Sequence, residues 1–177
     1  MAKAREWLHK KARGSERIGV LVTKEAARYK PLAVHILPSG DENAVHWFLD
    51  DRFDTRSSNY LEDAATEIQV QGLELDYTCV LWDADMRYEK GKWHFYKFNG
   101  HSDWIEQTST SESKQELIKY MLNAYRVLLT RARHGMIICV PYGNSNTING
   151  FPEDRTRLPE FYDGTYNYLK HLGLIEI

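Results

Sequence analysis

Two short, uninterrupted apolar runs constrain the fold of this 177-residue chain more than any other feature. They are YTCVLW at residues 77–82 and MIICV at residues 136–140. A run whose apolar residues are not confined to alternate positions is typical of a parallel strand that is covered on both faces. We therefore expect both runs to be central strands of a layered α/β sheet.

A long helix is predicted between these two strands. Ser113 and Glu116 have the spacing of a capping box, and apolar residues then recur at helical intervals to about Arg131. A strand, a crossover helix and a second strand would form one right-handed unit of the sheet.

Shorter patterns predict the remaining elements. Trp7 and Leu8 lie among basic residues, which predicts a short basic amphipathic helix that ends near Gly14. This helix either packs against the core or contacts nucleic-acid phosphates, and the overall charge does not separate the two roles. We also expect strands at 17–22, 33–37, 46–49 and 92–98, helices at 59–65 and 159–172, and loops at 99–113 and 142–158.

Composition narrows the class of protein. A net charge of −2 excludes a generally basic nucleic-acid coat, although a local basic stripe is still allowed. Cys79 and Cys139 lie inside apolar runs, which favours free thiols and a cytoplasmic location. No apolar stretch approaches the ~20 residues that span a bilayer, so we expect no membrane partner. The length fits a single domain over residues 1–177.

Two polar segments carry the candidate chemistry, namely TEIQVQGLELD at 66–76 and NAYRVLLTRARHG at 123–135. Both are expected at strand edges, where open α/β sheets place their ligands. Gly72 allows a close backbone turn, and Glu74 is available to hold ribose hydroxyls. Arg131 is suited to neutralise charge on transferred phosphate oxygens, although a helix end also favours a solvated or salt-bridged cation.

These segments resemble known motifs. Gln71-Gly72-Leu73-Glu74 resembles motif V of superfamily-1 helicases, and VLLTRAR at 127–133 resembles motif VI. Nearly the whole chain, from RIGVLVTKEAAR to DRTRLPEFYDGTYNYLKHLG, is similar to the Schlafen group 3-like DNA/RNA helicase domain family. The resemblance implies a RecA-like layered α/β sheet, mostly parallel, with helices on both faces and a small β insertion. In such proteins two RecA-like domains sandwich ATP, and this chain would be the second.

The resemblance also implies roles for matching residues. Arg131 would be the catalytic arginine finger that reaches the γ-phosphate. The other residues at the nucleotide would be Gln71, Gly72, Glu74, Arg28 and Arg133. Thr66 and Gln69 would lie toward single-stranded DNA or RNA, and Gln71 would couple nucleotide state to that strand. For Arg28 a surface salt bridge is an equal alternative, and Arg56, Arg155 and Arg157 fit the family pattern as loop anchors or phosphate contacts.

The sequence contains no G-x-x-x-x-G-K-[ST] phosphate loop. We therefore expect ATP and Mg²⁺ to bind only in the full-length protein, together with an N-terminal RecA-like domain that carries this loop. The chain alone is expected to be inactive, with no tightly bound cofactor and no metal site of its own.

Two rival functions remain open. The first is a non-catalytic protein or nucleic-acid interaction module derived from a RecA-like fold, which would bind through the basic N-terminal helix and the aromatic tail. The second is a metal-dependent nuclease built on Asp83, Asp85 and Glu89 with Lys90, although a loop role also explains the two aspartates.

Overall fold

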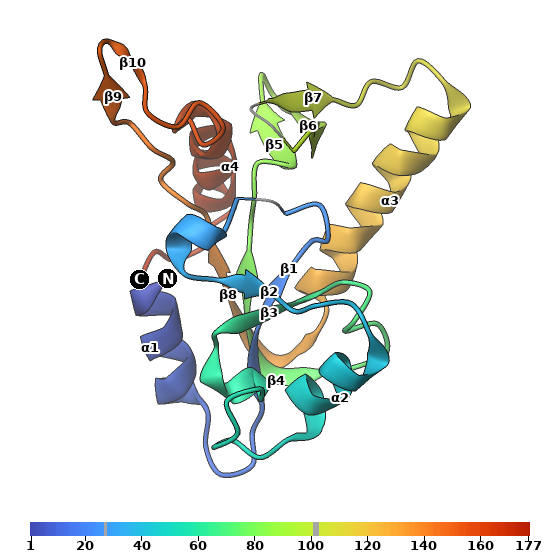
Figure 1. Ribbon diagram of the computed structural model, residues 1–177, viewed down its shortest axis with the longest axis vertical. Coiled ribbons are helices and arrows are strands. Elements are labelled where there is room, and N and C mark those ends of the chain that lie inside the picture. Colours follow the sequence, from blue (N-terminus) through green and yellow to red (C-terminus); the bar gives the residue numbers. More distant parts are fainter. Residues whose placement is uncertain (27, 101–102) are drawn as a thin grey trace. The chain divides into compact units, whose positions relative to one another are not determined.

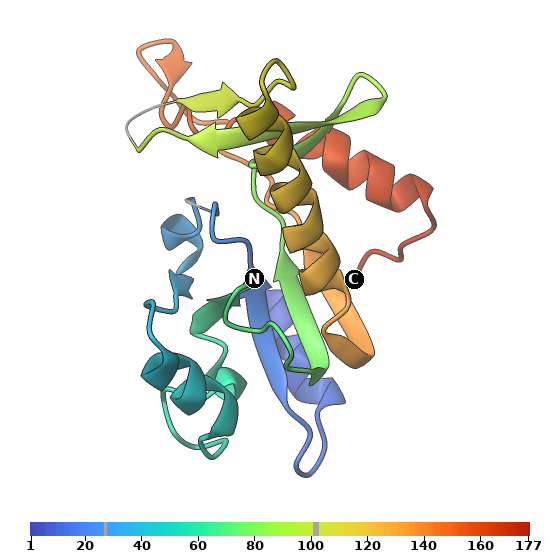
Figure 2. The ribbon, with the colours of Figure 1, turned by 90° about the vertical axis from the view of Figure 1, so that its right-hand side faces the viewer.

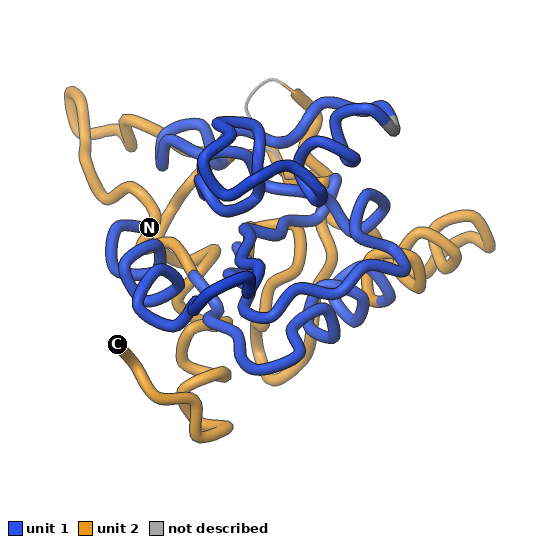
Figure 3. Tube along the Cα trace, turned by 90° about the horizontal axis from the view of Figure 1, so that it is seen from below, with its two compact units in different colours: residues 1–24, 29–81, 123–139 blue, residues 25–28, 82–122, 140–177 orange. Residues whose placement is uncertain are grey.

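The computed structural model describes residues 1–26, 28–100 and 103–177 and divides the chain into two compact units. Figure 3 colours them separately. Unit 1 comprises residues 1–24, 29–81 and 123–139, and unit 2 comprises residues 25–28, 82–122 and 140–177. Each unit has its own sheet. The expectation of one domain over residues 1–177 stays a prediction.

Unit 1 is built on a five-stranded sheet in which every neighbouring pair is parallel. In spatial order its strands are β2 (His35–Ile36), β3 (Asp63–Thr66), β1 (Ile18–Val22), β4 (Leu75–Leu81) and β8 (Ala132–Cys139). The predicted parallel α/β sheet is confirmed, with β4 in its interior. The expectation that residues 136–140 form a central strand is wrong. Residues 136–139 belong to β8, which ends before Val140, pairs only with β4 in the described sheet and is half-buried along most of its length.

Helices cover both faces of this sheet, as Figures 1 and 2 show. They are α1 (Ala2–Lys11), α2 (Asp41–Leu49) and the last turns of α3 (Glu112–Leu129). On one face α1 buries Ala4 and Leu8, and its Trp7 meets Tyr77 of β4 edge-on, with ring centroids 5.9 Å apart. The predicted basic amphipathic helix is therefore present and packs on the sheet.

The opposite face carries the hydrophobic core of unit 1. Trp47 of α2 is 1% exposed and lies over Gly19 of β1, where a Cβ atom would come within 2.8 Å of the indole carbons. Glycine at this position lets the helix approach the strand closely. The same cluster contains Leu21, Leu37, Ala65, Val70, Leu75, Val80 and Leu128.

Two short elements of unit 1 differ from their predictions. Residues 46–49, expected as a strand, form the end of α2, because four residues are too few to separate a strand period from a helical one. Residues 59–65, expected as a helix, form part of a single 3₁₀ turn and then enter β3. Ser57 does cap this turn, but Leu61 takes a left-handed conformation (φ 60°) and ends it.

Unit 2 contains the small β insertion between β4 and α3. Its strands β5 (Met86–Glu89), β6 (Lys92–Phe98) and β7 (Trp104–Glu106) form an antiparallel sheet in that order. The strand predicted at 92–98 is confirmed. The loop predicted at 99–113 is wrong in part, since β7 lies within it and α3 begins at Glu112. His101 and Ser102 lie outside the described residues.

Helix α4 (Glu160–His171) packs on β5 in unit 2 and confirms the helix predicted at 159–172. The backbone N–H of Tyr88 donates to Thr165 Oγ1 at 3.1 Å. A Cβ atom at Gly164 would collide with the carbonyl of Tyr88, so this contact requires glycine. The stretch at 142–158, predicted as loop, also contains a two-residue hairpin of β9 (Thr147–Ile148) and β10 (Phe151–Pro152).

Both cysteines are free thiols. Cys79 is fully buried, and burial raises the pKa of its thiol. None of the described helices combines the length and the apolar composition needed to cross a membrane.

Candidate functional site

The two polar segments meet in unit 1 where β4 and β8 begin. The backbone N–H of Leu75 donates to the carbonyl of Arg131 at 2.9 Å, and Leu75 pairs with Ala132 in the sheet register. The turn at 71–74 therefore lies beside Arg131. Both strands begin at this edge, whereas open α/β sheets usually bind ligands at the edge where strands end. In this respect the position differs from the expected one.

Gly72 shapes the turn that precedes β4. Its φ of 83° lies in the left-handed region, which strains any residue with a side chain. No atom of the residues that the structure describes lies within 4 Å of the position that a Cβ atom would take. The side chains of Gln71 and Glu74 on either side are exposed. The backbone of the turn is thus open to a ligand at Gly72.

Arg131 is half-buried and anchored by neutral groups. Its Nε donates to the carbonyl of Val127 at 3.0 Å, Nη1 to the carbonyl of Leu73 at 3.1 Å, and Nη2 to the hydroxyl of Thr130 at 3.1 Å. Among the described residues no carboxylate forms an ion pair with it. These contacts use three of the five N–H donors of the guanidinium group, so its charge is held in place without being neutralised.

Arg133 and Glu74 pair with each other across the strands. Arg133 Nε lies 2.9 Å from Glu74 Oε2, and the two side chains are 58% and 55% exposed. An exposed pair of this kind contributes about 0–1 kcal/mol, so a ligand can separate its members at little cost. The structure thus brings Gln71, Gly72, Glu74, Arg131 and Arg133 together at one edge.

Thr66 and Gln69 lie at the opposite edge, where β3 ends. The backbone N–H and the hydroxyl of Thr66 both donate to Gln69 Oε1, at 2.9 and 3.0 Å. The Gln69 amide in turn donates to the carbonyl of Pro38 at 3.0 Å. The two residues that were predicted to contact single-stranded nucleic acid are therefore brought together. They hold each other and the chain after β2 in place.

Glu67 belongs to this second edge and was missed by the sequence analysis. It is 5% exposed, and its Oε2 accepts the backbone N–H of Lys24 at 2.8 Å. The carboxylate therefore joins the ends of β1 and β3. The only signal in the sequence is a carboxylate directly after a short strand, which is too common to predict this contact.

Arg28 belongs to unit 2, where it forms the salt bridge that was its alternative role. Its Nη2 lies 2.9 Å from Asp154 Oδ2, and its guanidinium carbon lies 5.8 Å from the ring centroid of Phe98. Burial opposes ionisation of Asp154, but hydrogen bonds from Thr156 and Arg28 hold the pKa of this carboxyl below its ordinary value. The assignment of Arg28 to a nucleotide stays a prediction.

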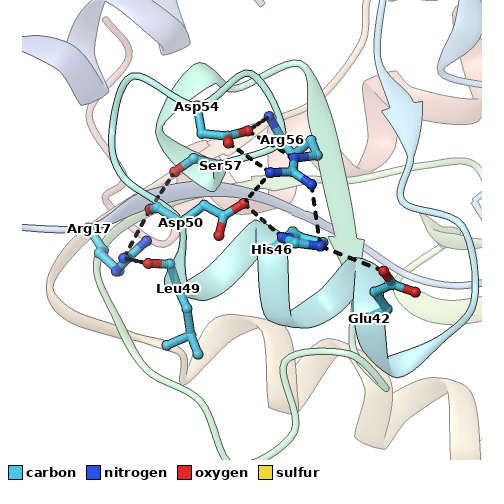
Figure 4. A network of polar contacts seen from close by, with 8 residues as sticks. All are labelled: Arg17, Glu42, His46, Leu49, Asp50, Asp54, Arg56 and Ser57. Carbon is cyan, nitrogen blue, oxygen red and sulfur yellow. Dashed lines mark hydrogen bonds and ion pairs between the residues drawn. The ribbon is translucent and has the colours of Figure 1, made fainter.

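Arg56 anchors a loop of unit 1, as Figure 4 shows. Its Nε and Nη2 donate to the two carboxylate oxygens of Asp54, at 3.0 and 2.9 Å, and Nη2 also lies 3.1 Å from Asp50. His46 Nδ1 lies 2.8 Å from the same Asp50 carboxylate. Hydrogen bonds from Arg56 lower the pKa of Asp54. In unit 2, Arg155 pairs with Asp103 at 2.8 Å.

The aspartates of the nuclease alternative are buried in unit 2. Asp83 and Asp85 are each 1% exposed. Asp83 accepts the backbone N–H of Ala84 at 2.8 Å and the hydroxyl of Tyr162 at 3.3 Å. The described residues contain no group of three or more His, Cys, Asp or Glu side chains placed to hold a metal ion. The geometry therefore gives Asp83 a structural role.

Comparison with known proteins identifies the family. No curated protein and no solved structure matches the chain. Residues 1–142 match the family described as Schlafen group 3, DNA/RNA helicase domain. This match covers more than half of the chain and includes both polar segments. The chain belongs to the Schlafen group 3 DNA/RNA helicase domain family.

Proposed function

We propose that this chain is the second RecA-like domain of a superfamily-1 helicase-type ATPase and contributes Arg131 to an ATP site shared with a phosphate-loop domain. One observation carries the proposal: the half-buried guanidinium of Arg131 is fixed by two carbonyls and a hydroxyl rather than by a carboxylate. A cation that is positioned but not neutralised is what a transferred phosphoryl group requires.

The surroundings of Arg131 strengthen this role. The carbonyls at the end of α3 carry the negative end of the helix dipole, which stabilises a cation there. Arginine stays charged under all physiological conditions, and its two remaining N–H donors suit phosphate oxygens. Partial burial reduces screening by water, so the attraction to phosphate is stronger than on an open surface.

The adjacent turn at 71–74 supplies the rest of this chain's part of the ATP site, which we call the ATP half-site. Separation of the exposed Glu74–Arg133 pair would free a carboxylate for the ribose hydroxyls and a guanidinium for phosphate. The open backbone at Gly72 would allow the nucleotide to approach closely. ATP and Mg²⁺ would belong to the shared site, and the N-terminal RecA-like domain would supply the phosphate loop and the magnesium-binding carboxylates.

The opposite edge of the sheet would contact single-stranded DNA or RNA through Thr66 and Gln69. Residues 66–74 run from the end of β3 to the start of β4 and so connect this edge with the ATP half-site. A nucleotide that shifts the turn at Gln71 and Gly72 would move the segment that Thr66 and Gln69 lock in place. This continuity supports coupling between ATP hydrolysis and the nucleic-acid strand.

The test is nucleic-acid-stimulated ATP hydrolysis by the assembly of this chain with its phosphate-loop domain. We expect Arg131→Ala to lower the rate by about 1,000-fold or more, and Arg131→Lys to restore only a fraction, because lysine lacks the planar fork. Arg126→Ala is the matched control, since Arg126 is an exposed arginine of α3, the helix that precedes Arg131, and it hydrogen-bonds Asn123 at 2.9 Å.

An unchanged rate in Arg131→Ala, or an equal loss in Arg126→Ala, would refute the arginine-finger role. Binding of oligonucleotide without any ATP hydrolysis by the assembly would instead favour a non-catalytic interaction module.

A further inference from the structure

A basic and aromatic cavity of about 480 Å³ lies between α1 and β4 in unit 1. Its lining residues are Trp7, Lys10, Lys11, Arg13, Glu16 and Tyr77. None of the residues proposed above for the ATP half-site or for the contact of Thr66 and Gln69 with nucleic acid is among them. The cavity is therefore a separate candidate site.

Positive charge is concentrated around this cavity. The first 17 residues contain six Lys or Arg and two Glu, whereas the other 160 contain 17 basic and 23 acidic residues. Lys10 pairs with Glu6 at 2.6 Å, but no carboxylate within ion-pair distance of Lys11 or Arg13 occurs among the described residues. A local cationic site on an otherwise acidic chain is suited to a polyanion.

Two aromatic rings form one wall of the cavity. Trp7 and Tyr77 are both half-buried, and their planes meet at 84°. Trp7 is held in position because its neighbour Leu8 is fully buried against the sheet. Lys11 Nζ lies 5.6 Å from the Trp7 ring centroid, so a phosphate bound by Lys11 would place its attached nucleoside beside the indole.

We propose that this cavity binds a nucleotide unit of single-stranded nucleic acid, with the base against Trp7 and Tyr77 and the phosphates paired with Lys11 and Arg13. Aromatic rings combined with cations are the usual means of binding unpaired bases and their backbone. An acidic peptide would use the cations but not the rings, and a duplex keeps its bases stacked inside. The site stands independently of the ATP half-site.

Photocrosslinking locates the base directly. Short oligo(dT) and oligo(U), each with one 5-iodouracil, are irradiated with the intact chain, and the crosslinked peptides are mapped by mass spectrometry. We expect crosslinks at Trp7 or Tyr77, and the more reactive oligonucleotide identifies DNA or RNA as the preferred strand. Crosslinks confined to other residues, such as those near Thr66 and Gln69, would overturn the assignment.

The affinity for a labelled oligonucleotide, measured by fluorescence anisotropy, tests the role of the Lys11 and Arg13 charges. Lys11→Gln/Arg13→Gln removes two proposed phosphate contacts, so the negative slope of log affinity against log salt is expected to become shallower by about 1.4. The matched control is Lys114→Gln/Lys119→Gln, which removes two exposed lysines of α3. Equal weakening in both double variants would refute a specific site, as would an absence of binding by the unmodified chain.

Substitution of Trp7 tests the stacking contact. We expect Trp7→Ala to weaken oligonucleotide binding by about 5- to 100-fold and Trp7→Phe to retain most of the affinity. Circular dichroism of each variant shows whether α1 still folds. Normal affinity in a folded Trp7→Ala variant, or displacement of the oligonucleotide by polyglutamate at equal charge concentration, would show that the cavity is a general anion surface.

Discussion

Arg131 in unit 1 is half-buried and Arg87 in unit 2 is buried, and the groups around the two guanidinium groups differ. Arg87 is 3% exposed, and its guanidinium carbon lies 3.9 Å from the ring centroid of Tyr96 and 3.7 Å from that of Phe161. Its Nε donates to the carbonyl of Ala84 at 2.7 Å, and burial lowers its pKa. Arg131 instead lies half-buried at a sheet edge and is held by neutral oxygens.

The difference separates a structural arginine from a candidate catalytic one. The rings of Tyr96 and Phe161 lie against the buried Arg87 guanidinium, so its charge stabilises the packing of α4 on the β insertion and is not available to a ligand. Each of the three nitrogens of the Arg131 guanidinium donates one hydrogen bond to these oxygens, which leaves two N–H donors for an incoming phosphate.

The largest effect on stability is expected at Arg87. Arg87→Ala removes two ring contacts and leaves a cavity, so the free energy of unfolding should fall by about 3 kcal/mol. Arg87→Met retains much of the volume and removes a buried charge, and it should cost far less. Urea unfolding followed by circular dichroism measures both. If Arg87→Ala were as stable as the unmodified chain, the structural role of this arginine would be wrong.

Alkaline pH tests the packing of Tyr96 against Arg87. Burial, reinforced by Glu89, raises the pKa of Tyr96 to about 12, although Arg87 opposes the shift. In the unfolded chain the pKa of a tyrosine is about 10. The stability that the neutral Tyr96 hydroxyl contributes to the folded state is therefore complete below about pH 10 and is lost as the pH rises toward about 12. The unmodified chain and the Tyr96→Phe variant are each titrated by ultraviolet absorbance, and the difference between the two curves reports the ionisation of Tyr96. We expect this ionisation above about pH 10, and a midpoint near pH 10 would contradict the partial burial of this ring.

Arg131→Ala should cost only about 1 kcal/mol of stability, because water can replace its hydrogen bonds at the exposed end of α3. The same urea series measures this value. A loss as large as that of Arg87→Ala would mean that Arg131 is mainly a structural residue, and it would remove the basis for the contrast.

The smallest effect is expected for the exposed Glu74–Arg133 pair. A double-mutant cycle with Glu74→Gln and Arg133→Gln should give a coupling energy of at most about 1 kcal/mol, and salt should reduce it further. A larger, salt-insensitive coupling would show that the pair is locked, and the carboxylate would then be unavailable to a ribose.

The elements predicted correctly are those whose signal is local and long. The run at 77–82 is apolar without alternation, and the helix that ends at Leu129 is long enough to establish a helical period. The four-residue run at 46–49 does not, and tertiary packing of Trp47 on Gly19 decides its conformation. The edge position of β8 depends on which strands the sheet contains, which its own sequence does not encode.

The candidate site was predicted in its composition but not in its pairings. The turn at Gly72 and the position of Arg131 after α3 follow from local sequence. The contact of Arg133 with Glu74 spans 59 positions, and that of Arg28 with Asp154 spans 126. Such distant partners are fixed by the fold alone. The cavity beside Trp7 was equally hidden, since Tyr77 reaches it from a strand predicted as simply apolar.

The charge of Arg131 is tested most directly by the affinity of the assembled ATP site for ADP with aluminium fluoride, which mimics the phosphoryl group during transfer. Arg131→Ala should weaken binding of this mimic by about 1,000-fold and should change the affinity for ADP alone by no more than about threefold. Equal affinity of the variant and the unmodified assembly for the mimic would show that Arg131 does not act on the transferred phosphate.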